Sequence, residues 1–590
     1  MEMESQLVQL CIDSACSSRE SIKRWRMQRR SLERLPPQLA GALVRRLIQR
    51  HLLSPSLLEV FKYCVEEMDL RDETYVDAEW MAYLGGFRYL RCLNIAGCQR
   101  ITSSAIWPLS GMSHLKELDL SRCVKFNDSG IRHLLSISTL EKLYLSETRL
   151  TAAGVSLLAS LSNLSFLDLG GLPVTDQALG SLQVLSKLQY LDLWGSKVSD
   201  NGVAVLEKFP QLCHLNLAWT SVSLLPNFTS LEYLNMSNCN INSVFQYHGD
   251  KPCLVELRIA GITFANEAVI FENIEKHFLS LLDASKSPFS RFGFLSFMVG
   301  LEYLDLSSTG LGDESMEQIA IIGTNLRDLN LSNTRVSSAG VRILAGCVPN
   351  LKNLSLSHTA IDDFAICFLS MMPALKAIDL SHTSIKGFIQ KEGDGSDQIF
   401  SLTTLQVQPL EKLNLESTLI EDDSLVPLAK LHGLSQLSLR NGSLTDISLH
   451  LLSSLPDLKT LSFRDIVLTN AGLNSFKPPE TLEVLDIRGC WLLTVEAILS
   501  FHKRHPRVEV RHELIPALPS ENDSSMHASP SRVTLKSKQV IGQTPENLHL
   551  SPAFIDQRLK YDREKLLALR YSSLSLILKD GGNISEMLLQ

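Results

Sequence analysis

Leucines at fixed intervals are the most regular feature of the chain. Leu191 follows Leu188 by three residues and Leu193 follows Leu191 by two, with polar or aromatic residues between them. Side chains on a strand alternate between two faces, so this spacing predicts a short β-strand with one buried face. The same arrangement begins again at Leu212, 24 residues after Leu188. The chain therefore repeats one structural unit along this stretch.

The segment between two such strands predicts a helix. In residues 198–206, Val203 and Leu206 lie three positions apart, as on the apolar face of a helix, and Ser199 or Asp200 is placed to cap its N-terminus. One strand and one helix cannot bury their apolar faces alone. Stacked copies can, because each unit then covers its neighbours in a continuous core.

The frame Leu-x-x-Leu-x-Leu-x-x-Thr/Cys at this period is typical of leucine-rich repeats. We expect an α/β fold, a leucine-rich-repeat solenoid of about 17–18 repeats over residues 63–512, curved like a horseshoe with a parallel sheet on the concave face and helices on the convex face. The frames begin at Leu90, Leu115, Leu140, Leu164, Leu188, Leu212, Leu231, Leu254, Leu301, Leu326, Leu351, Leu375, Leu410, Leu434, Leu458 and Leu482, with weaker ones at Val65 and Leu279.

Three segments interrupt the frame. Residues 221–227 are too few for a full helix and predict an extended or 3₁₀ turn. The frame blurs between 254 and 301, which predicts a distorted repeat with a loop. Residues 386–408 exceed the normal period and predict a flexible surface insertion. The glycines of this insertion do not form a phosphate loop, since no Gly-Lys-Ser/Thr follows them.

The two ends of the chain carry no repeat frame. Residues 1–62 predict a small helical block that caps the first repeat or docks a partner. Residues 513–552 are dense in serine, proline and charge, which predicts a disordered linker. Residues 553–590 turn helical in pattern and predict a terminal helical segment.

Charge and cysteine content indicate which ligands and which cellular compartment to expect. A net charge of −8 gives no general attraction to nucleic acid or anionic membranes, and no apolar run approaches the roughly 18 residues of a membrane span. The basic stretch 19–34 is better explained as a solvated helix face or an acidic partner's contact than as a nucleic-acid site. Four cysteines occupy the threonine position of the frame, namely Cys98, Cys123, Cys239 and Cys490. Buried free thiols, and no signal-peptide pattern, predict a cytoplasmic or nuclear protein.

Two motifs in the N-terminal block resemble docking boxes of ubiquitin-ligase receptors. Leu7-x-x-x-Cys11-x-x-x-Ala15 is similar to the elongin-C-binding box, and Leu35-Pro36-x-x-Leu39-x-x-x-Leu43 is similar to the cullin box that follows it. Ahead of leucine-rich repeats, the pair resembles the zyg-type and zer-type substrate receptors of cullin–RING ligases. The resemblance implies an adaptor-docking helix pair, with Leu7 and Cys11 in the adaptor groove and Pro36, Leu39 and Leu43 against the cullin.

The match has departures and alternatives. Gln6 stands where those receptors have a small residue, and nothing after 512 could form their armadillo-like array, so their substrate specificity is not implied. Leu-Pro-x-x-Leu also opens F-box motifs, and the repeats resemble those of F-box receptors, which bind Skp-type adaptors. Two other interpretations stay open: the block is a plain cap, or the protein is an intracellular scaffold in signalling or defence.

Catalytic chemistry is not indicated. The chain has no nucleophile elbow, nucleotide-binding loop or kinase motif. His358 and His382 share a frame position in successive repeats, but two histidines without a third ligand are a poor zinc site. We therefore expect no enzyme activity, metal or cofactor, and a protein or peptide as the ligand.

The predicted concave face carries the candidate ligand-binding residues. Aromatic and acidic residues gather at outward strand positions, and strands about 4.8 Å apart would place Phe166, Tyr190, His214 and Tyr233 in a ladder. Aromatic anchors are typical of binding hot spots, and the acids favour a basic peptide or an N-terminal amine. The acids taken alone are better explained as ordinary solvated strand residues. The full candidate set is Phe166, Tyr190, Asp192, Trp194, His214, Trp219, Tyr233 and Tyr303.

Overall fold

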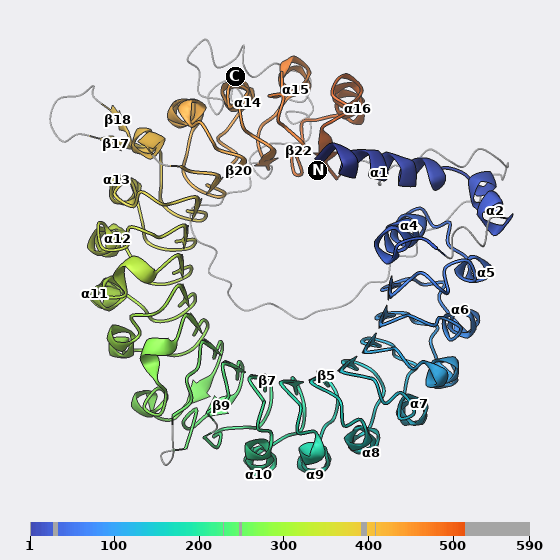
Figure 1. Cartoon of the computed structure of the whole chain (residues 1–590). Helices are drawn as coiled ribbons and strands as arrows, with labels where there is room; N and C mark the ends of the chain where they lie inside the picture. Colours follow the sequence, from blue (N-terminus) through green and yellow to red (C-terminus); the bar gives the residue numbers. More distant parts are fainter. Residues whose placement is uncertain are drawn as a thin grey trace, which may run out of the picture. The chain divides into compact units, whose positions relative to one another are not determined.

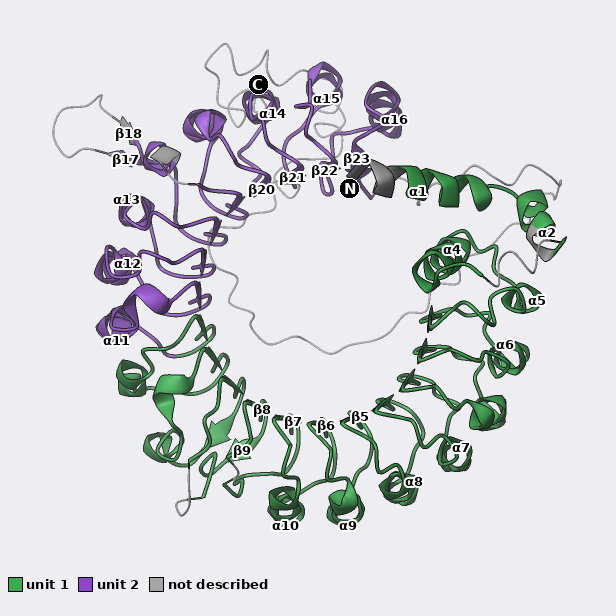
Figure 2. Cartoon of the chain, in the orientation of Figure 1, with its two compact units in different colours: residues 1–309 green, residues 310–590 purple. Residues whose placement is uncertain are grey.

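The computed structural model describes residues 2–27, 34–227, 229–246, 251–390, 398–407 and 409–513. The chain divides into two compact units, residues 1–309 and 310–590 (Figure 2). Four predicted segments lie partly or wholly outside the described residues. They are the basic stretch (28–33), the insertion (391–397 and 408), the linker (all but residue 513) and the terminal helical segment (553–590).

The repeats of the first unit build a parallel sheet whose strands follow chain order. Neighbouring strands pair in register, so Leu167 lies beside Leu191 and Leu191 beside Leu215. All three leucines are fully buried. Within this unit the strands line the inner side and the helices the outer side (Figure 1). The strands are β1 (Glu67–Asp69), β2 (Cys92–Asn94), β3 (Glu117–Asp119), β4 (Lys142–Tyr144), β5 (Phe166–Asp168), β6 (Tyr190–Asp192), β7 (His214–Asn216), β8 (Tyr233–Asn235), β10 (Glu256–Arg258), β12 (Leu281–Asp283) and β13 (Tyr303–Asp305).

The second unit repeats the same arrangement. Its parallel strands are also in register, and two of them extend to five residues. The strands are β14 (Asp328–Asn330), β15 (Asn353–Ser355), β16 (Ala377–Asp379), β19 (Lys412–Asn414), β20 (Gln436–Arg440), β21 (Thr460–Arg464), β22 (Val484–Asp486) and β23 (Glu509–Arg511). The predicted leucine-rich-repeat solenoid is confirmed in each unit.

Short helices connect the strands. Val203 and Leu206 are fully buried, as their spacing predicts. In the first unit the helices are α6 (Ala78–Leu84), η1 (Ser103–Gly111), α7 (Asp128–Leu134), α8 (Ala152–Leu157), η2 (Leu158–Ser160), α9 (Asp176–Ser181), η3 (Leu182–Val184), α10 (Asp200–Val203), η4 (Ala204–Lys208), η5 (Glu267–Val269), η6 (Lys276–Phe278) and η7 (Gly293–Phe297). In the second they are η8 (Asp313–Ser315), α11 (Met316–Ala320), η9 (Gly323–Asn325), α12 (Ser338–Leu344), α13 (Asp363–Leu369), η10 (Ser401–Val407), η11 (Asp422–Lys430), α14 (Asp446–Leu452), α15 (Asn470–Ser475) and α16 (Val495–Arg504).

A carboxylate at the start of many helices links one repeat to the next. Asp176 accepts hydrogen bonds from the backbone N–H of Ser199 (2.8 Å) and from its hydroxyl (2.6 Å). Ser199 occupies the N-cap position of α10, but its side chain does not cap the helix. The prediction that its hydroxyl caps the helix is therefore wrong, because the hydroxyl bonds to Asp176 of the preceding repeat instead. Asp446 and Thr469 form the same link in the second unit.

The same link explains a glycine three residues after the bonded serine or threonine, Gly202 after Ser199 and Gly472 after Thr469. A Cβ at Gly202 would collide with the Asp176 carboxylate, and a Cβ at Gly472 would collide with that of Asp446. Each glycine thus makes room for the aspartate that holds the two repeats together. These glycines serve the stacking of repeats rather than a ligand site.

The irregular segments of the structure coincide with the stretches where the leucine frame is interrupted. Residues 221–227 form no helix, and Ser221 and Leu225 make isolated bridges to neighbouring repeats. β9 (Asn240–Ile241) pairs with β11 (Thr263–Phe264) in a separate parallel ribbon. In the insertion, β17 (Phe388–Gln390) and β18 (Gln398–Phe400) form an antiparallel pair. The ends of the insertion are therefore ordered strands.

The N-terminal block consists of α1 (Glu2–Ala15), α2 (Arg19–Met27), α4 (Pro37–Gln49) and α5 (Pro55–Leu58). α4 begins with Pro37 at its first position, where a missing N–H costs nothing. It packs on β1 and buries Ala40, Val44 and Leu47, so it covers the edge of the sheet. α1 packs on α4 in turn.

All twelve cysteines are free. Cys98 and Cys123 are fully buried and each thiol donates to a backbone carbonyl of the preceding repeat, as the frame position predicts. Burial raises the pKa of both thiols to about 12, which makes them unreactive core groups. Within the described ranges, no helix combines the length and apolar character needed to cross a bilayer.

Candidate protein-binding surfaces

Stacked rings run across the strand side of the first unit. Phe166, Tyr190, His214 and Tyr233 occupy the same register position in β5 to β8. Their ring centroids are 3.8, 4.2 and 3.6 Å apart, with interplanar angles of 11°, 20° and 3°. The predicted ladder is therefore confirmed as a structure. Because the faces of the rings cover one another, the ladder presents ring edges and polar tips to a ligand.

Two further residues extend the ladder at its ends. Tyr144, at the other outward position of β4, reaches Phe166 with a centroid distance of 4.5 Å. The Arg258 guanidinium lies 5.9 Å from the Tyr233 ring centroid. We call Tyr144, Phe166, Tyr190, His214 and Tyr233 the aromatic ladder. The sequence prediction missed Tyr144, although its outward position beside the first ring of the row was a signal.

Tyr303 does not join the aromatic ladder. It occupies the same register position in β13, but β10 and β12 lie between it and β8 and carry Glu256 and Leu281 there. Tyr303 therefore stays a separate candidate on the strand side, outside the four residues predicted to stack. The reason is simply distance, because a row of rings is continuous only across adjacent strands.

The acidic and amide residues beside the ladder have a local structural role. Asp168, Asp192 and Asn216 each accept a hydrogen bond from the backbone N–H two residues ahead, at 2.9, 2.8 and 3.1 Å. Such Asx turns end the strand and start the next segment. A carboxylate has about four acceptor sites, so these bonds leave Asp168 and Asp192 capacity for a ligand.

Burial changes the titration of the ladder and its neighbours. Desolvation raises the pKa of Asp168 to about 6, and the nearby Asp192 carboxylate adds to the effect. The pKa of Asp192 is also raised, chiefly by desolvation. Desolvation and the charge of Arg258 lower the pKa of His214 to about 4. At neutral pH the ladder is uncharged. It lies beside two carboxylates whose ionised forms are disfavoured by burial.

Two exposed tryptophans lie beyond the strands, in the turns that follow them. Trp194 comes two residues after the end of β6 and is 39% exposed. Trp219 follows β7 in a left-handed backbone conformation (φ 60°) and is 60% exposed. Both were expected on the strand face itself. They instead flank the ladder from its rim, where large rings are free to contact a partner.

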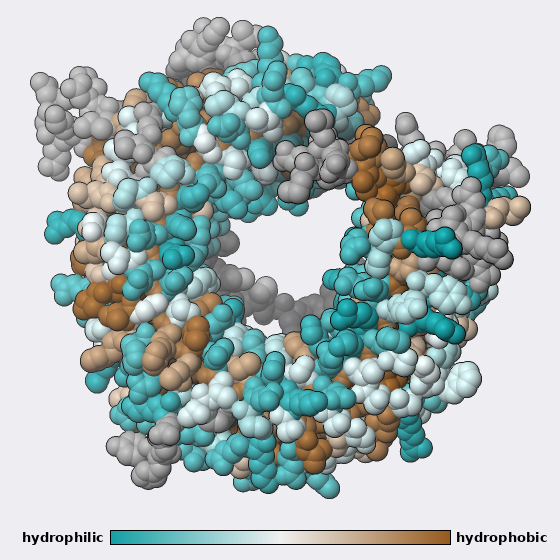
Figure 3. Space-filling view, in the orientation of Figure 1, coloured by the Kyte–Doolittle hydropathy of each residue, from teal (hydrophilic) through white to brown (hydrophobic). Residues whose placement is uncertain are grey.

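A second apolar surface lies on α1. Leu7 and Leu10 are each 65% exposed, and Cys11 is exposed with them, whereas Ile12 is 6% exposed and Cys16 is fully buried. Figure 3 shows hydrophobic residues gathered along this helix. We call Leu7, Val8, Leu10 and Cys11 the α1 apolar face. Ala15 lies at the end of the helix and is half-buried.

Charged side chains hold the C-terminal half of α1 in place. Asp13 pairs with Arg46 of α4 and, at 3.6 Å, with Arg50. Arg50 also donates to the carbonyl oxygens of Asp13 (3.4 Å) and Cys16 (3.1 Å). These carbonyls are otherwise unsatisfied at a helix end, so Arg50 both caps α1 and fixes it to α4.

The residues of the second motif divide between surface and core. Pro36 is exposed at the start of α4, and Leu35 and Leu39 are half-buried. Leu43 is buried with the core-facing residues of α4. Its expected direct contact with a cullin is therefore incompatible with this packing. Its role in the structure is to seat α4 on the first repeat.

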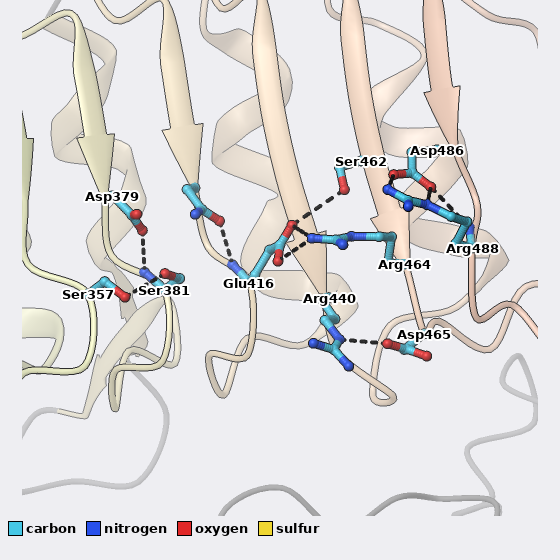
Figure 4. Close-up of polar contacts among 11 residues, drawn as sticks. Ser357, Asp379, Ser381, Glu416, Arg440, Ser462, Arg464, Asp465, Asp486 and Arg488 are labelled. Atoms are coloured by element: carbon cyan, nitrogen blue, oxygen red, sulfur yellow. Dashed lines mark hydrogen bonds and ion pairs between the residues drawn. The ribbon is translucent and has the colours of Figure 1, made fainter. Parts of the chain in front are cut away.

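The second unit carries a charged row instead of an aromatic one. Arg464 bonds both carboxylate oxygens of Glu416, Arg440 pairs with Asp465 at 2.6 Å, and Arg488 pairs with its neighbour Asp486 (Figure 4). Each guanidinium shown is thus matched by a carboxylate within the unit. Such pairing lowers the attraction for an external acidic group.

His358 and His382 lie together, as their shared frame position suggests. Their rings stack with centroids 3.9 Å apart. No group of three or more histidine, cysteine or acidic side chains within the described parts of the chain is arranged to hold a metal ion. The histidine pair has no third ligand there.

Comparisons with known proteins find leucine-rich repeats in parts of the chain. Two family models described as leucine-rich repeats match residues 111–135, 301–320 and 230–248. No curated protein matches the chain. Among solved structures, an internalin from Listeria monocytogenes is similar at 22% identity, covering 57% of this chain and 93% of that one, with a TM-score of 0.41.

Two receptor structures are similar over longer stretches. A TLR13–ssRNA13 complex matches at 18% identity over 77% of this chain and 64% of that one, with a TM-score of 0.48. The ectodomain of an Arabidopsis thaliana receptor kinase, GASSHO1, matches at 17% identity over 79% of this chain and 58% of that one, with a TM-score of 0.36. This chain spans less than two thirds of either.

Proposed function

We propose that this leucine-rich repeat protein is a substrate receptor of a cullin–RING ubiquitin ligase. In this proposal the α1 apolar face docks an elongin-C-type or Skp-type adaptor, and the strand side of the first unit binds the protein substrate. The chain would contribute proximity between substrate and ligase rather than catalysis. The resemblance of the two N-terminal motifs motivates the proposal, and the exposure of α1 supports it.

The exposure of Leu7 and Cys11 is the observation that carries the proposal. A helix that merely capped the solenoid would turn its apolar residues toward the first repeat. α1 instead buries Ile12 and Cys16 and leaves Leu7, Leu10 and Cys11 in solvent. Burying a leucine fully is worth about 1.5–3 kcal/mol. An exposed face of this kind favours docking to a groove on another protein.

The anchoring of α1 also suits a docking helix. The Asp13, Arg46 and Arg50 contacts fix one half of the helix to the solenoid before any partner arrives. A preformed helix loses less conformational entropy on binding than a segment that folds on contact. Leu35, Pro36 and Leu39, at the start of α4, are the residues of the second motif that remain accessible to a cullin.

Co-precipitation from cells tests the proposal. The intact chain and a Leu7→Ser/Cys11→Ser variant would be expressed in cells and precipitated, and the proteins that co-precipitate would be identified by mass spectrometry. A Val184→Ser variant is the matched control, because Val184 is 58% exposed on η3 and belongs to neither surface. We expect a cullin with its adaptor in the intact and control samples and at least tenfold less in the double variant.

Circular dichroism must show that the double variant is folded, and exposed positions should tolerate serine. Recovery of elongin C would identify the first adaptor class, and recovery of a Skp-type adaptor the second. A folded intact chain that recovers no cullin would contradict the proposal. The protein would then be an interaction scaffold whose N-terminal block serves another partner.

A further inference from the structure

Acidic and tryptophan side chains meet at one place on the strand side of the first unit. Asp168 and Asp192 are register partners in β5 and β6, so their carboxylates occupy adjacent strands. Trp194 follows β6, and Glu147 lies in the turn after β4. We call Glu147, Asp168, Asp192 and Trp194 the acidic–indole patch. It lies at the turn end of the strands that carry the aromatic ladder.

Two glycines bring the members of the patch together. A Cβ on Gly170 would lie 3.2 Å from Asp168 Oδ1 and 3.4 Å from Asp192 Oδ1. A Cβ on Gly171 would lie 3.1 Å from Trp194 Cζ3 and 3.3 Å from Glu147 Cγ. The indole and the three carboxylates therefore surround a short stretch of backbone that has no side chains of its own.

The three carboxylates of the patch lack a counter-charge. Nearby bases are already paired, Lys142 with Glu117 at 3.3 Å and Arg122 with Asp72 at 3.0 Å. Among the described residues, neither Asp168, Asp192 nor Glu147 has an ion-pair partner. Asp192 Oδ2 accepts one bond, from the Asn216 amide at 2.8 Å, which is neutral. The patch is thus a concentration of unbalanced negative charge next to an exposed indole.

We propose that the acidic–indole patch binds a lysine or arginine side chain of an extended segment of the substrate. Carboxylates form strong charge-assisted hydrogen bonds with such a cation, and an indole face attracts it further. The segment would continue across the aromatic ladder, where ring edges and Tyr190 and Tyr233 offer apolar contact and hydroxyl groups. This inference rests on the proposed function only in taking the strand side as the substrate surface.

Other ligand classes fit the patch less well. An acidic or phosphorylated segment would be repelled by three carboxylates, and the backbone of nucleic acid would be repelled for the same reason. A purely apolar segment would remove the carboxylates from water without replacing their solvation. The raised pKa of Asp168, caused mainly by desolvation, shows that its charge is already costly there. A cation would relieve that cost.

The test has two steps. Random linear peptides displayed on phage are first selected for binding to the immobilised full-length chain. The affinity of one selected peptide for the chain is then measured by fluorescence anisotropy. The key variant is Asp168→Asn/Asp192→Asn. Asparagine occupies the equivalent position in β7 and β8 and makes the same turn, so the change removes charge and keeps the backbone. Asp283→Asn in β12 is the matched control, because Asp283 makes the same turn away from the patch.

We expect selected peptides to be enriched in lysine or arginine next to apolar residues. Affinity should fall about tenfold in the double variant and in Trp194→Ala, and stay unchanged in Asp283→Asn and in Trp107→Ala, whose exposed indole lies on η1. Binding should also weaken as salt rises from about 50 to about 300 mM. Peptides without basic residues, no enriched peptides at all, or an unchanged double variant would each overturn the inference.

The Leu7→Ser/Cys11→Ser variant separates this inference from the ligase proposal. It should bind the selected peptide as the intact chain does, because α1 is not part of the patch. Loss of cullin recovery with retained peptide binding supports both ideas. Peptide binding by a chain that recovers no cullin would remove the ligase role and leave the patch as a ligand site.

Discussion

Replacing His214 by phenylalanine tests the electrostatics of the aromatic ladder without removing its stacking. His214 lies between Tyr190 and Tyr233, with centroids 4.2 and 3.6 Å away. Phe166 already shows that a phenyl ring fits this register position, since it stacks on Tyr190 at 3.8 Å. The variant therefore keeps a planar ring in place and removes the one imidazole of the row.

The expected effect follows from the pKa of His214. An imidazole titrates near 6.5 in an unfolded chain, and desolvation together with Arg258 lowers the pKa of His214 to about 4. The unfolded state thus binds a proton more readily than the folded state between these values. Stability from the neutral ring is complete above about pH 6.5 and is lost as the pH falls toward 4.

The magnitude can be bounded from the same values. A difference of about 2.5 in pKa corresponds to at most about 3.4 kcal/mol. His214 is half-buried, so solvent reduces this to about 1–2 kcal/mol. The free energy of unfolding of the wild type should therefore drop by about 1–2 kcal/mol more than that of His214→Phe between about pH 7 and pH 4.5.

Urea unfolding of the full chain, followed by tryptophan fluorescence at several pH values, measures this difference. Trp194 and Trp219 flank the ladder and report on it directly. His114→Phe, at an exposed position outside the ladder, is the control for replacing a histidine by phenylalanine. The two flanking rings also attract a cation, by about 0.5–1 kcal/mol. If that attraction dominated, the wild type would gain stability on acidification, and our reasoning would be refuted.

Further predictions concern the stacking of repeats and the cost of buried charge. Gly202→Ala should lower the melting temperature, because its Cβ would collide with a carboxylate of the preceding repeat, whereas Gly180→Ala, with open space around it, should raise stability by about 0.5–1 kcal/mol. Asp446→Ala should cost about 3 kcal/mol in thermal unfolding, since it leaves the buried Thr469 N–H and O–H donors without an acceptor. Asp168→Asn should stabilise the chain by about 1–2 kcal/mol near pH 7.5, and the gain should vanish near pH 4, because the pKa of this carboxyl is raised and its ionised form is the costly one.

The fold could be predicted because the repeat fixes register. Once the leucine frame is placed, every outward position of one strand must lie beside the same position of the next. This is why Phe166, Tyr190, His214 and Tyr233 could be placed in one row from sequence alone. The same rule gave the four threonine-position cysteines a buried place, which the structure confirms.

Contacts that depend on side-chain direction could not be predicted in this way. Tyr144 reaches the ladder diagonally, from a different outward position, so strand register alone does not indicate it. The Ser199 hydroxyl turns to Asp176 of the preceding repeat rather than to its own helix. Leu43 lies in a motif that suggested a surface, but the seating of α4 on β1 buries it. Each outcome depends on how neighbouring elements pack, which the frame does not contain.

The two candidate surfaces belong to the same unit, and this bears on how a receptor would work. α1 is fixed to α4, and α4 packs on β1, the first strand of the sheet that carries the aromatic ladder. Five strand steps of about 4.8 Å separate β1 from β6, so the repeats between them act as a spacer of about 24 Å along the sheet. A ligase receptor acts by holding its substrate at a set distance from the adaptor. Register pairing and the aspartate links between repeats make that distance a property of the fold, whereas our proposal assigns ligand choice to a few positions, such as Trp194 and Gly171, that the leucine frame does not specify.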